Sequence, residues 1–366
     1  MPTKSANDLR KQVGQLLILG FERTECDARL SRLLRDLRPG GVILFARNIA
    51  DARQTHRLLK DCEATVGGPL FRCVDLEGGT VDRLREAIAP TPSAAEAAAT
   101  GNRRLFRRHG RLLGEEARAL GFNVDFAPVL DLRLPASQKV LGTRTASTEP
   151  ARVVTYAREF LRGLNAAKVL GCGKHFPGLG AASLDSHFEL PIIKKPWRRL
   201  WAEDLVPYRQ LKNVPSFVMV AHAAFPAVTG NRTPASMSRK WIEDVLRKRI
   251  GYRGLIVSDD LEMGAAQAAG SIEDVAVAAV RAGADMFLVC RKEDLVRRAW
   301  EAVVHEAERD QRFALEVEQS AARVMARKRR ARELRGLAPA PDRKKVEGLR
   351  RAVAGLWKQV HRELAL

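Results

Sequence analysis

Eight short apolar runs recur along the 366-residue chain, and stretches with helical spacing separate most of them. Most of these runs are nearly continuous rather than alternating, which is typical of strands buried on both faces of a parallel sheet. The runs extend from Leu17 to Phe21, Gly41 to Phe45, Phe71 to Asp75, Asn123 to Val129, Val169 to Phe176, Phe217 to His222, Leu255 to Asp259 and Met286 to Cys290. This pattern predicts repeated strand–helix units.

Helical patterns between the runs support the same interpretation. Apolar residues spaced by three and four occur from Asp51 to Val66, Leu105 to Leu120, Ala151 to Ala167 and Asp274 to Ala282. Eight strands alternating with helices favour a fold of the α/β class, a single (β/α)8 TIM barrel. An open doubly wound sheet is the structural alternative, but the GxGxxG turn that marks many such sheets is absent after the first run.

The last part of the chain is predicted to be an extension appended to the barrel. A helical stretch follows Leu315, and the sequence LAPAPD at residues 337–342 interrupts it. A basic amphipathic helix then closes the chain, and its apolar side comprises Val346, Leu349, Val353, Leu356, Trp357 and Val360. We therefore expect a barrel over residues 1–337 and a basic helical extension over residues 338–366, docked on the barrel or on a partner.

The positive charge of the chain is concentrated in this last part. The net charge is +20, and residues 321–366 hold fourteen lysines and arginines against four acidic residues, a net of +10. A solvated, arginine-rich surface is the favoured explanation. The alternative is a protein that binds nucleic acid or a membrane surface through its tail. No zinc finger, RNP-type aromatic motif or GXXG loop supports that alternative.

Cysteine usage and the N-terminal sequence bear on the compartment. The five cysteines are widely spaced and form no CxxC pair, so neither a zinc site nor a disulfide framework is indicated. Such usage fits a reducing compartment. The N-terminal apolar run is too short for a signal peptide, and no stretch is long enough to cross a bilayer. We therefore expect a cytoplasmic protein without a transmembrane segment.

Charged and polar residues collect where the predicted strands end. In a barrel, the carboxyl ends of the strands carry the active site, so side chains at successive strand ends should converge. The residues at these positions are Asp75 and Glu77, Asp131, Lys174 and His175, His222, and Asp259 and Asp260. Asp125 falls in the middle of a predicted strand and has no assigned role.

The densest segment is GKHFPGLGAASLDSHFELP, which follows the fifth strand. Lys174 and His175 end the strand, and a loop punctuated by glycine and proline leads to Asp185 and His187. Long loops of this kind are often functional, and an aspartate two residues from a histidine can hold the imidazole ring. The loop has little to bury, so we expect it to be mobile.

Two further segments carry chemistry. In VDLEGGTVDRL, paired glycines permit a tight turn that could bring Asp75 and Arg83 to one ligand. In IVSDDLEMGA, an apolar run ends at Asp259, whose carboxylate should lie at the barrel mouth. The alternative is that one of the two aspartates caps the next helix, and both interpretations hold if Asp260 or Ser258 supports the structure while Asp259 reacts.

Together these segments resemble glycoside hydrolase family 3, in particular its bacterial β-N-acetylglucosaminidases of cell-wall recycling. The similarity extends from Leu9 to Leu337 and includes GGVILFARNI, NVDFAPVLD, VLGTR, PASMS, IVSDDLEM, and KHFPGLG with DSH at the family's spacing. The DSH loop distinguishes this branch from the β-glucosidases of the family. The chain departs from the usual KHFPGHG at Leu179, and from the usual DQEGGRVQRL in its DLEGGTVDRL segment.

The resemblance implies specific roles. Asp259 matches the catalytic nucleophile, His187 the acid/base, and Asp185 the partner that polarises this histidine. The positions that match the sugar-binding residues are Asp75, Arg83, Arg144, Lys174 and His175. Members of this branch are single barrels that need no metal or other cofactor. They act on muropeptides carrying N-acetylglucosamine β-1,4-linked to 1,6-anhydro-N-acetylmuramic acid.

The implied reaction is hydrolysis with retention of configuration, through a covalent glycosyl-enzyme. An imidazole titrates near neutral pH, so it can donate a proton in the first step and accept one in the second. Because an anionic phosphate is not repelled by an imidazole, a phosphorolytic N-acetylglucosaminidase on the same fold is the enzymatic alternative.

Overall fold

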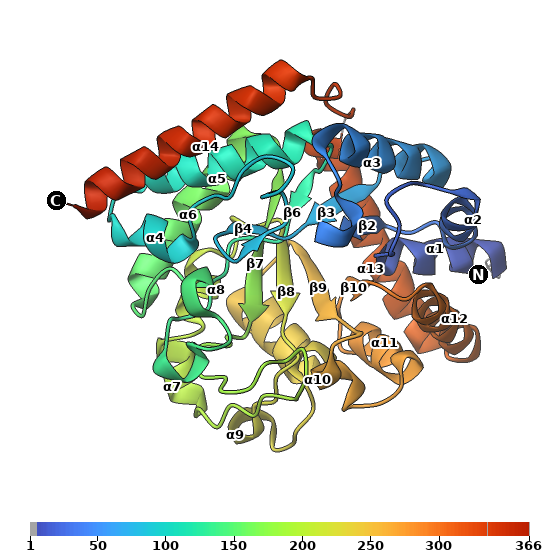
Figure 1. Cartoon of the computed structure of the whole chain (residues 1–366). Coiled ribbons are helices and arrows are strands. Elements are labelled where there is room, and N and C mark those ends of the chain that lie inside the picture. Colours follow the sequence, from blue (N-terminus) through green and yellow to red (C-terminus); the bar gives the residue numbers. More distant parts are fainter. Residues whose placement is uncertain (1–5, 335, 366) are drawn as a thin grey trace.

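Within residues 6–334 and 336–365, which this computed structural model describes, eight parallel strands close into a barrel (Figure 1). The strands are β1 (Leu17–Leu19), β2 (Gly41–Leu44), β3 (Phe71–Val74), β6 (Val124–Asp125), β7 (Leu170–Phe176), β8 (Phe217–Val220), β9 (Leu255–Asp260) and β10 (Met286–Val289). Each predicted run supplies one strand, and they follow one another in sequence order until β10 pairs with β1. The predicted (β/α)8 barrel is confirmed.

The barrel explains why the runs are continuous rather than alternating. Ile18, Phe71, Phe217 and Leu288 belong to an apolar cluster that fills the barrel interior. Their neighbours along each strand belong to a second cluster, shared with the surrounding helices. Since successive side chains of a strand point to opposite faces, burial of both faces requires apolar residues at nearly every position.

Strand β6 is much shorter than the predicted run from Asn123 to Val129. The chain remains extended beyond Asp125, because the backbone N–H of Phe126 donates to Val74 and that of Leu130 donates to Lys174. Pro128 has no N–H to donate, which limits regular pairing in this segment. The prediction placed the strand correctly and overestimated its length.

Helices surround the barrel. They are α1 (Ala6–Leu16), α2 (Ala28–Leu37), α3 (Ala52–Val66), α4 (Ala94–Ala99), α5 (Arg103–Ala119), α6 (Pro150–Ala166), α7 (Trp197–Ala202), α8 (Val206–Gln210), α9 (Pro226–Thr229), α10 (Gly264–Gln267), α11 (Ile272–Arg281), α12 (Glu293–Arg309), α13 (Gln311–Arg330) and α14 (Arg343–Leu364). A π-helix spans Lys240–Ile250, and short 3-10 turns occupy several loops. The four predicted helical stretches correspond to α3, α5, α6 and α11. Among the described residues, no helix is both long enough and apolar enough to cross a membrane.

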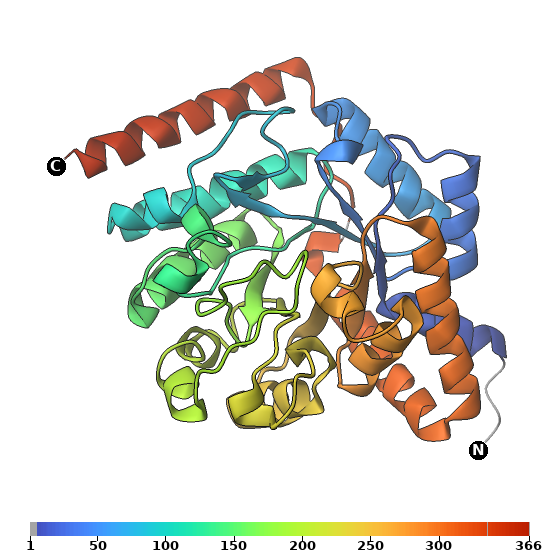
Figure 2. The ribbon, with the colours of Figure 1, turned by 60° about the horizontal axis from the view of Figure 1, so that its bottom comes forward.

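The C-terminal helix α14 packs against the barrel. Figures 1 and 2 both show it running along the outer side of α5. Its buried residues are Leu349, Val353, Leu356 and Val360, which all belong to the predicted apolar side. Trp357 Nε1 donates to the carbonyl of Pro90 at 2.8 Å, and Arg350 Nε donates to that of Ile88 at 2.9 Å. The sequence left open whether this helix docks on the barrel or on a partner, and in the structure it is docked on the barrel.

A pair of leucine variants tests whether α14 remains docked in solution. Leu356 is fully buried, whereas Leu364 on the same helix is 46% exposed. We expect Leu356→Ala to lower the free energy of unfolding by about 2–5 kcal/mol, and Leu364→Ala by no more than about 0.5 kcal/mol. Chemical denaturation measures both values. Equal, small losses would contradict the docking of this helix.

Candidate active site

The eight residues singled out from the sequence line one cavity at the carboxyl ends of the strands. They are Asp75, Arg83, Arg144, Lys174, His175, Asp185, His187 and Asp259. Lys174 and His175 belong to β7 and Asp259 to β9, while the others lie on loops that follow strands. The structure therefore brings together side chains that are far apart in the sequence.

Asp259 is half-buried near the end of β9, and its Oδ1 accepts the backbone N–H of Asp260 at 2.9 Å. Burial opposes ionisation, but the nearby imidazoles of His175 and His222 hold the pKa of this carboxyl below its usual value. His222 is itself fixed by Ser236 Oγ, at 2.7 Å from its Nδ1. Asp259 is therefore ionised at neutral pH, as a nucleophilic carboxylate must be.

Two cations, the buried Lys174 and the half-buried Arg144, share a carboxylate beside Asp259. Lys174 Nζ donates to Asp75 Oδ1 at 2.7 Å and lies 2.6 Å from Glu77 Oε1. Glu77 also accepts two hydrogen bonds from Arg144, at 2.8 and 2.9 Å. Burial would raise the pKa of Glu77, but Arg144 and Lys174 hold it far below its usual range. The bidentate geometry fixes the orientation of the guanidinium group.

His175 is held from behind by Asp131. Its Nδ1 lies 2.7 Å from Asp131 Oδ2, and the other oxygen of Asp131 accepts the backbone N–H of Leu179 at 2.7 Å. The second ring nitrogen, Nε2, lies 3.4 Å from Arg144 Nη2. Leu179, where this chain departs from the family's usual sequence, is buried and lines the cavity.

The tight turn predicted around the paired glycines is a hairpin of β4 (Leu76–Gly78) and β5 (Val81–Asp82). Gly78 and Gly79 have φ of 81° and 61°, which side chains disfavour. A Cβ at Gly78 would also lie 2.1 Å from the carbonyl oxygen of Pro92. The hairpin places Asp75 and Arg83 on the same cavity, and Arg83 Nε is buried without a hydrogen-bond partner among the described residues.

Asp185 and His187 form a hydrogen-bonded pair on the loop after β7. His187 Nδ1 lies 2.7 Å from Asp185 Oδ1, which also accepts the backbone N–H of His187 at 2.9 Å. The His187 side chain is 64% exposed. The backbone N–H groups of Gly264 and Ala265 donate to the carbonyls of His187 and Ser186, so this end of the loop is attached to the segment after β9. Mobility of the loop remains a prediction.

Sequence reasoning assigned no role to Glu77, Asp131 or Asp125. The first two orient the cations and the imidazole described above. Asp125 accepts the backbone N–H of Leu76 at 3.0 Å, which fixes the start of the hairpin. The role of Glu77 could have been predicted from the sequence. A buried cation such as Lys174 needs a carboxylate to balance its charge, and Glu77 follows the same strand as Asp75. Among the described residues, no group of three or more His, Cys, Asp and Glu is placed to hold a metal ion.

Glu77→Gln is expected to be strongly destabilising, because it leaves Arg144 and Lys174 with one carboxylate fewer in a buried network. Breaking a buried ion pair costs about 3–5 kcal/mol. The matched control is Glu115→Gln, which removes the partly exposed partner of the exposed Arg111 on α5 and should cost about 0.5 kcal/mol or less. Urea unfolding of both variants measures the difference. Similar losses would contradict the structural role of Glu77.

The comparisons with known proteins place this chain among the glycoside hydrolases, which is compatible with a TIM barrel that holds an ionised carboxylate and an Asp–His pair at one mouth. Residues 8–326 match the family model described as "Glycosyl hydrolase family 3 N terminal domain". The chain therefore belongs to glycoside hydrolase family 3, which confirms the resemblance seen in its motifs.

Relatives support this assignment. A protein of Bordetella parapertussis named beta-hexosaminidase is 42% identical over 273 residues, which cover 72% of this chain and 76% of that protein. The solved structure of a family 3 beta-N-acetylglucosaminidase from Paenibacillus is 31% identical with a TM-score of 0.90, covering 96% of this chain and 68% of that one. A beta-N-acetylhexosaminidase from Beutenbergia cavernae is 26% identical with a TM-score of 0.79, covering 90% of this chain and 99% of that one.

Proposed function

We propose that the enzyme is a retaining exo-β-N-acetylglucosaminidase that removes N-acetylglucosamine from the non-reducing end of a glycan. The observation that carries the proposal is the shared cavity of Asp259 and the Asp185–His187 pair, which come from two different strand ends. The names of the relatives and the DSH motif support the choice of sugar.

In the first step, a carboxylate oxygen of Asp259 attacks the anomeric carbon. The bond from this carbon to the leaving oxygen breaks, and His187 gives a proton to that oxygen. Asp185 holds Nδ1 of His187, so Nε2 is the atom that transfers the proton. In the second step, Nε2 takes a proton from water, the water attacks the same carbon, and Asp259 is released. Each step inverts the configuration at the anomeric carbon, so the released sugar retains the configuration of the substrate.

Five residues are proposed to hold the sugar: Asp75, Arg83, Arg144, Lys174 and His175. Glu77 orients Arg144 and Lys174, and Asp131 orients His175, so these three side chains are held in place before substrate arrives. A site built to hydrogen-bond hydroxyl and acetamido groups rejects sugars that lack them, because its buried polar groups are then left unpaired.

The proposed substrates are muropeptides that carry N-acetylglucosamine linked to 1,6-anhydro-N-acetylmuramic acid, hydrolysed in the cytoplasm without a metal or other cofactor. The five cysteines have free thiols in the structure, which is compatible with that compartment. Binding of nucleic acid or a membrane through the tail is not needed to explain its sequence. The apolar side of α14 packs on α5, and cations such as Lys344 and Arg351 are simply exposed.

Turnover of aryl β-N-acetylglucosaminide against aryl β-glucoside, with and without inorganic phosphate, tests the proposal. We expect the N-acetylglucosaminide to be strongly preferred and the β-anomer of the free sugar to appear first by NMR. Release of the sugar 1-phosphate in the presence of phosphate would establish the phosphorolytic alternative. Preference for the glucoside, or release of the α-anomer, would contradict the proposed reaction.

A further inference from the structure

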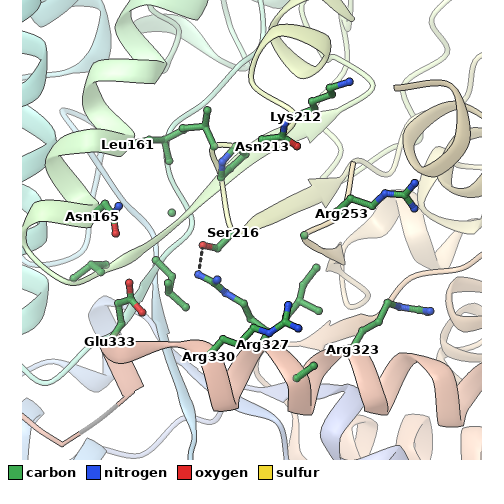
Figure 3. Close-up of a pocket in the computed structure, with 18 residues that line it drawn as sticks. Leu161, Asn165, Lys212, Asn213, Ser216, Arg253, Arg323, Arg327, Arg330 and Glu333 are labelled. Carbon is green, nitrogen blue, oxygen red and sulfur yellow. Dashed lines mark hydrogen bonds between the residues drawn. The ribbon is translucent and has the colours of Figure 1, made fainter. Parts of the chain in front are cut away.

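We propose a second ligand site, for a small molecule that carries one or more phosphate groups, at the amino-terminal end of the barrel (Figure 3). A cavity of about 570 Å³ lies between the C-terminal half of α13, the end of α6, and the starts of β7, β8 and β9. Its size is in the usual range for small-molecule sites. Because the strands are parallel, this cavity lies at the opposite end of the barrel from Asp259.

The cavity is strongly cationic. Its charged lining comprises Lys212, Arg253, Arg323, Arg327, Arg330 and a single carboxylate, Glu333. Arg323 is accounted for by its ion pair with Asp285. Within residues 6–334 and 336–365, the side chains of Lys212, Arg253 and Arg330 form no ion pair or hydrogen bond. A concave surface lined by one sign of charge attracts ions of the opposite sign.

Arg327 and Arg330 of α13, which form no ion pair among the described residues, are placed to act together, next to the paired Arg323. Arg323, Arg327 and Arg330 are four and three residues apart, so they share one face of the helix. Like charges at this spacing repel one another, and a bound anion would remove that repulsion. Figure 3 shows Arg327 extending from α13 across the cavity toward Ser216, with Arg330 beside it.

Arg327 is held in place at the wall of the cavity. Its Nη2 donates to Ser216 Oγ at 2.6 Å. Among the described residues no carboxylate forms an ion pair with Arg327, so its charge remains available to a bound anion. The side-chain amides of Asn165 and Asn213 also line the cavity and form no hydrogen bonds within the described part of the chain.

A phosphate group fits this lining better than a carboxylate. Guanidinium groups present parallel N–H donors that match phosphate oxygens, and those of Arg327 and Arg330 can share the oxygens of one phosphate or diphosphate. The volume also leaves room for an organic part against Leu161 and Val169. The site contains none of the proposed catalytic residues, so a test of anion binding does not depend on whether the proposed reaction is correct.

Calorimetric titration of the full chain with inorganic pyrophosphate and with adenosine 5′-diphosphate tests the site at physiological ionic strength. We expect both probes to bind with a Kd in the micromolar range. Arg330→Gln and Arg327→Gln should each weaken binding by about tenfold, equivalent to about 1.4 kcal/mol. The matched control is the double variant Arg104→Gln, Arg351→Gln, which removes two exposed charges on α5 and α14 and should change the Kd less than twofold.

Thermal unfolding of each variant checks that the fold is intact. Arg330 is the sharper test because it is exposed and, in the described part of the chain, its side chain forms no hydrogen bond or ion pair. Pyrophosphate should not compete with aryl β-N-acetylglucosaminide in steady-state kinetics. Three results would overturn the proposal. The first is a Kd above 1 mM for both probes. The second is an equal loss of affinity in the Arg330 variant and in the control. The third is competitive inhibition that Arg330→Gln leaves unchanged, because the anion would then bind in the catalytic cavity.

Discussion

Replacing Asp259 with alanine is expected to abolish turnover, with a loss on the order of 10⁵- to 10⁶-fold, while the barrel remains folded. The carboxylate lies near the end of β9 and, among the described residues, makes one hydrogen bond, to the backbone N–H of Asp260, so little packing depends on it. Release of nitrophenol from aryl β-N-acetylglucosaminide measures the loss. Near-native hydrolysis by this variant would remove Asp259 from the nucleophile role.

Two further experiments separate Asp259 from its neighbour. Asp260→Asn is the matched variant, because Oδ1 of Asp260 already accepts the backbone N–H groups of Glu262 and Cys290. It should lose far less activity. Sodium azide should restore release of nitrophenol by Asp259→Ala in a single displacement, and the product should then be the α-glycosyl azide. Formation of the β-azide by this variant would contradict direct attack at the vacated position.

The barrel could be predicted from the sequence because its strands are buried on both faces, and continuous apolar runs such as Phe217 to Val220 are the consequence. The length of β6 could not, because Phe126 to Val129 beyond its end is still apolar and extended, although Pro128 limits the pairing of this segment. The docking of α14 on α5 was also open. An amphipathic sequence shows which side of a helix is buried but not which surface covers it.

The location of the candidate site could be predicted from the charged residues at the strand ends. The contacts between its side chains could not. Glu77 and Arg144 are 67 residues apart, and their bidentate pairing depends on the distance between two loops across the barrel mouth. Asp131 likewise holds His175 from 44 residues away. Such pairings are set by the closure of the barrel, which places the ends of β3, β6 and β7 side by side.

Replacing His187 with alanine is expected to slow the hydrolysis of substrates to an extent that depends on their leaving groups. Substrates with poor leaving groups need protonation, so their glycosylation should slow by about 10²- to 10⁴-fold. Nitrophenyl substrates do not need it, so their first step should be much less affected. Deglycosylation should still be slow for both, because the attacking water lacks its base, and a burst of nitrophenol should precede the steady state.

Azide needs no base, so it should restore the second step of His187→Ala and yield the β-glycosyl azide, the opposite anomer to that expected with Asp259→Ala. His187 is 64% exposed with its Nδ1 held by Asp185, and we expect closure of the loop to bring Nε2 to the glycosidic oxygen. Glu189→Ala, an exposed change on the same loop, is the control and should retain near-native kinetics. Equal losses for good and poor leaving groups, without azide rescue, would show that His187 only supports the loop.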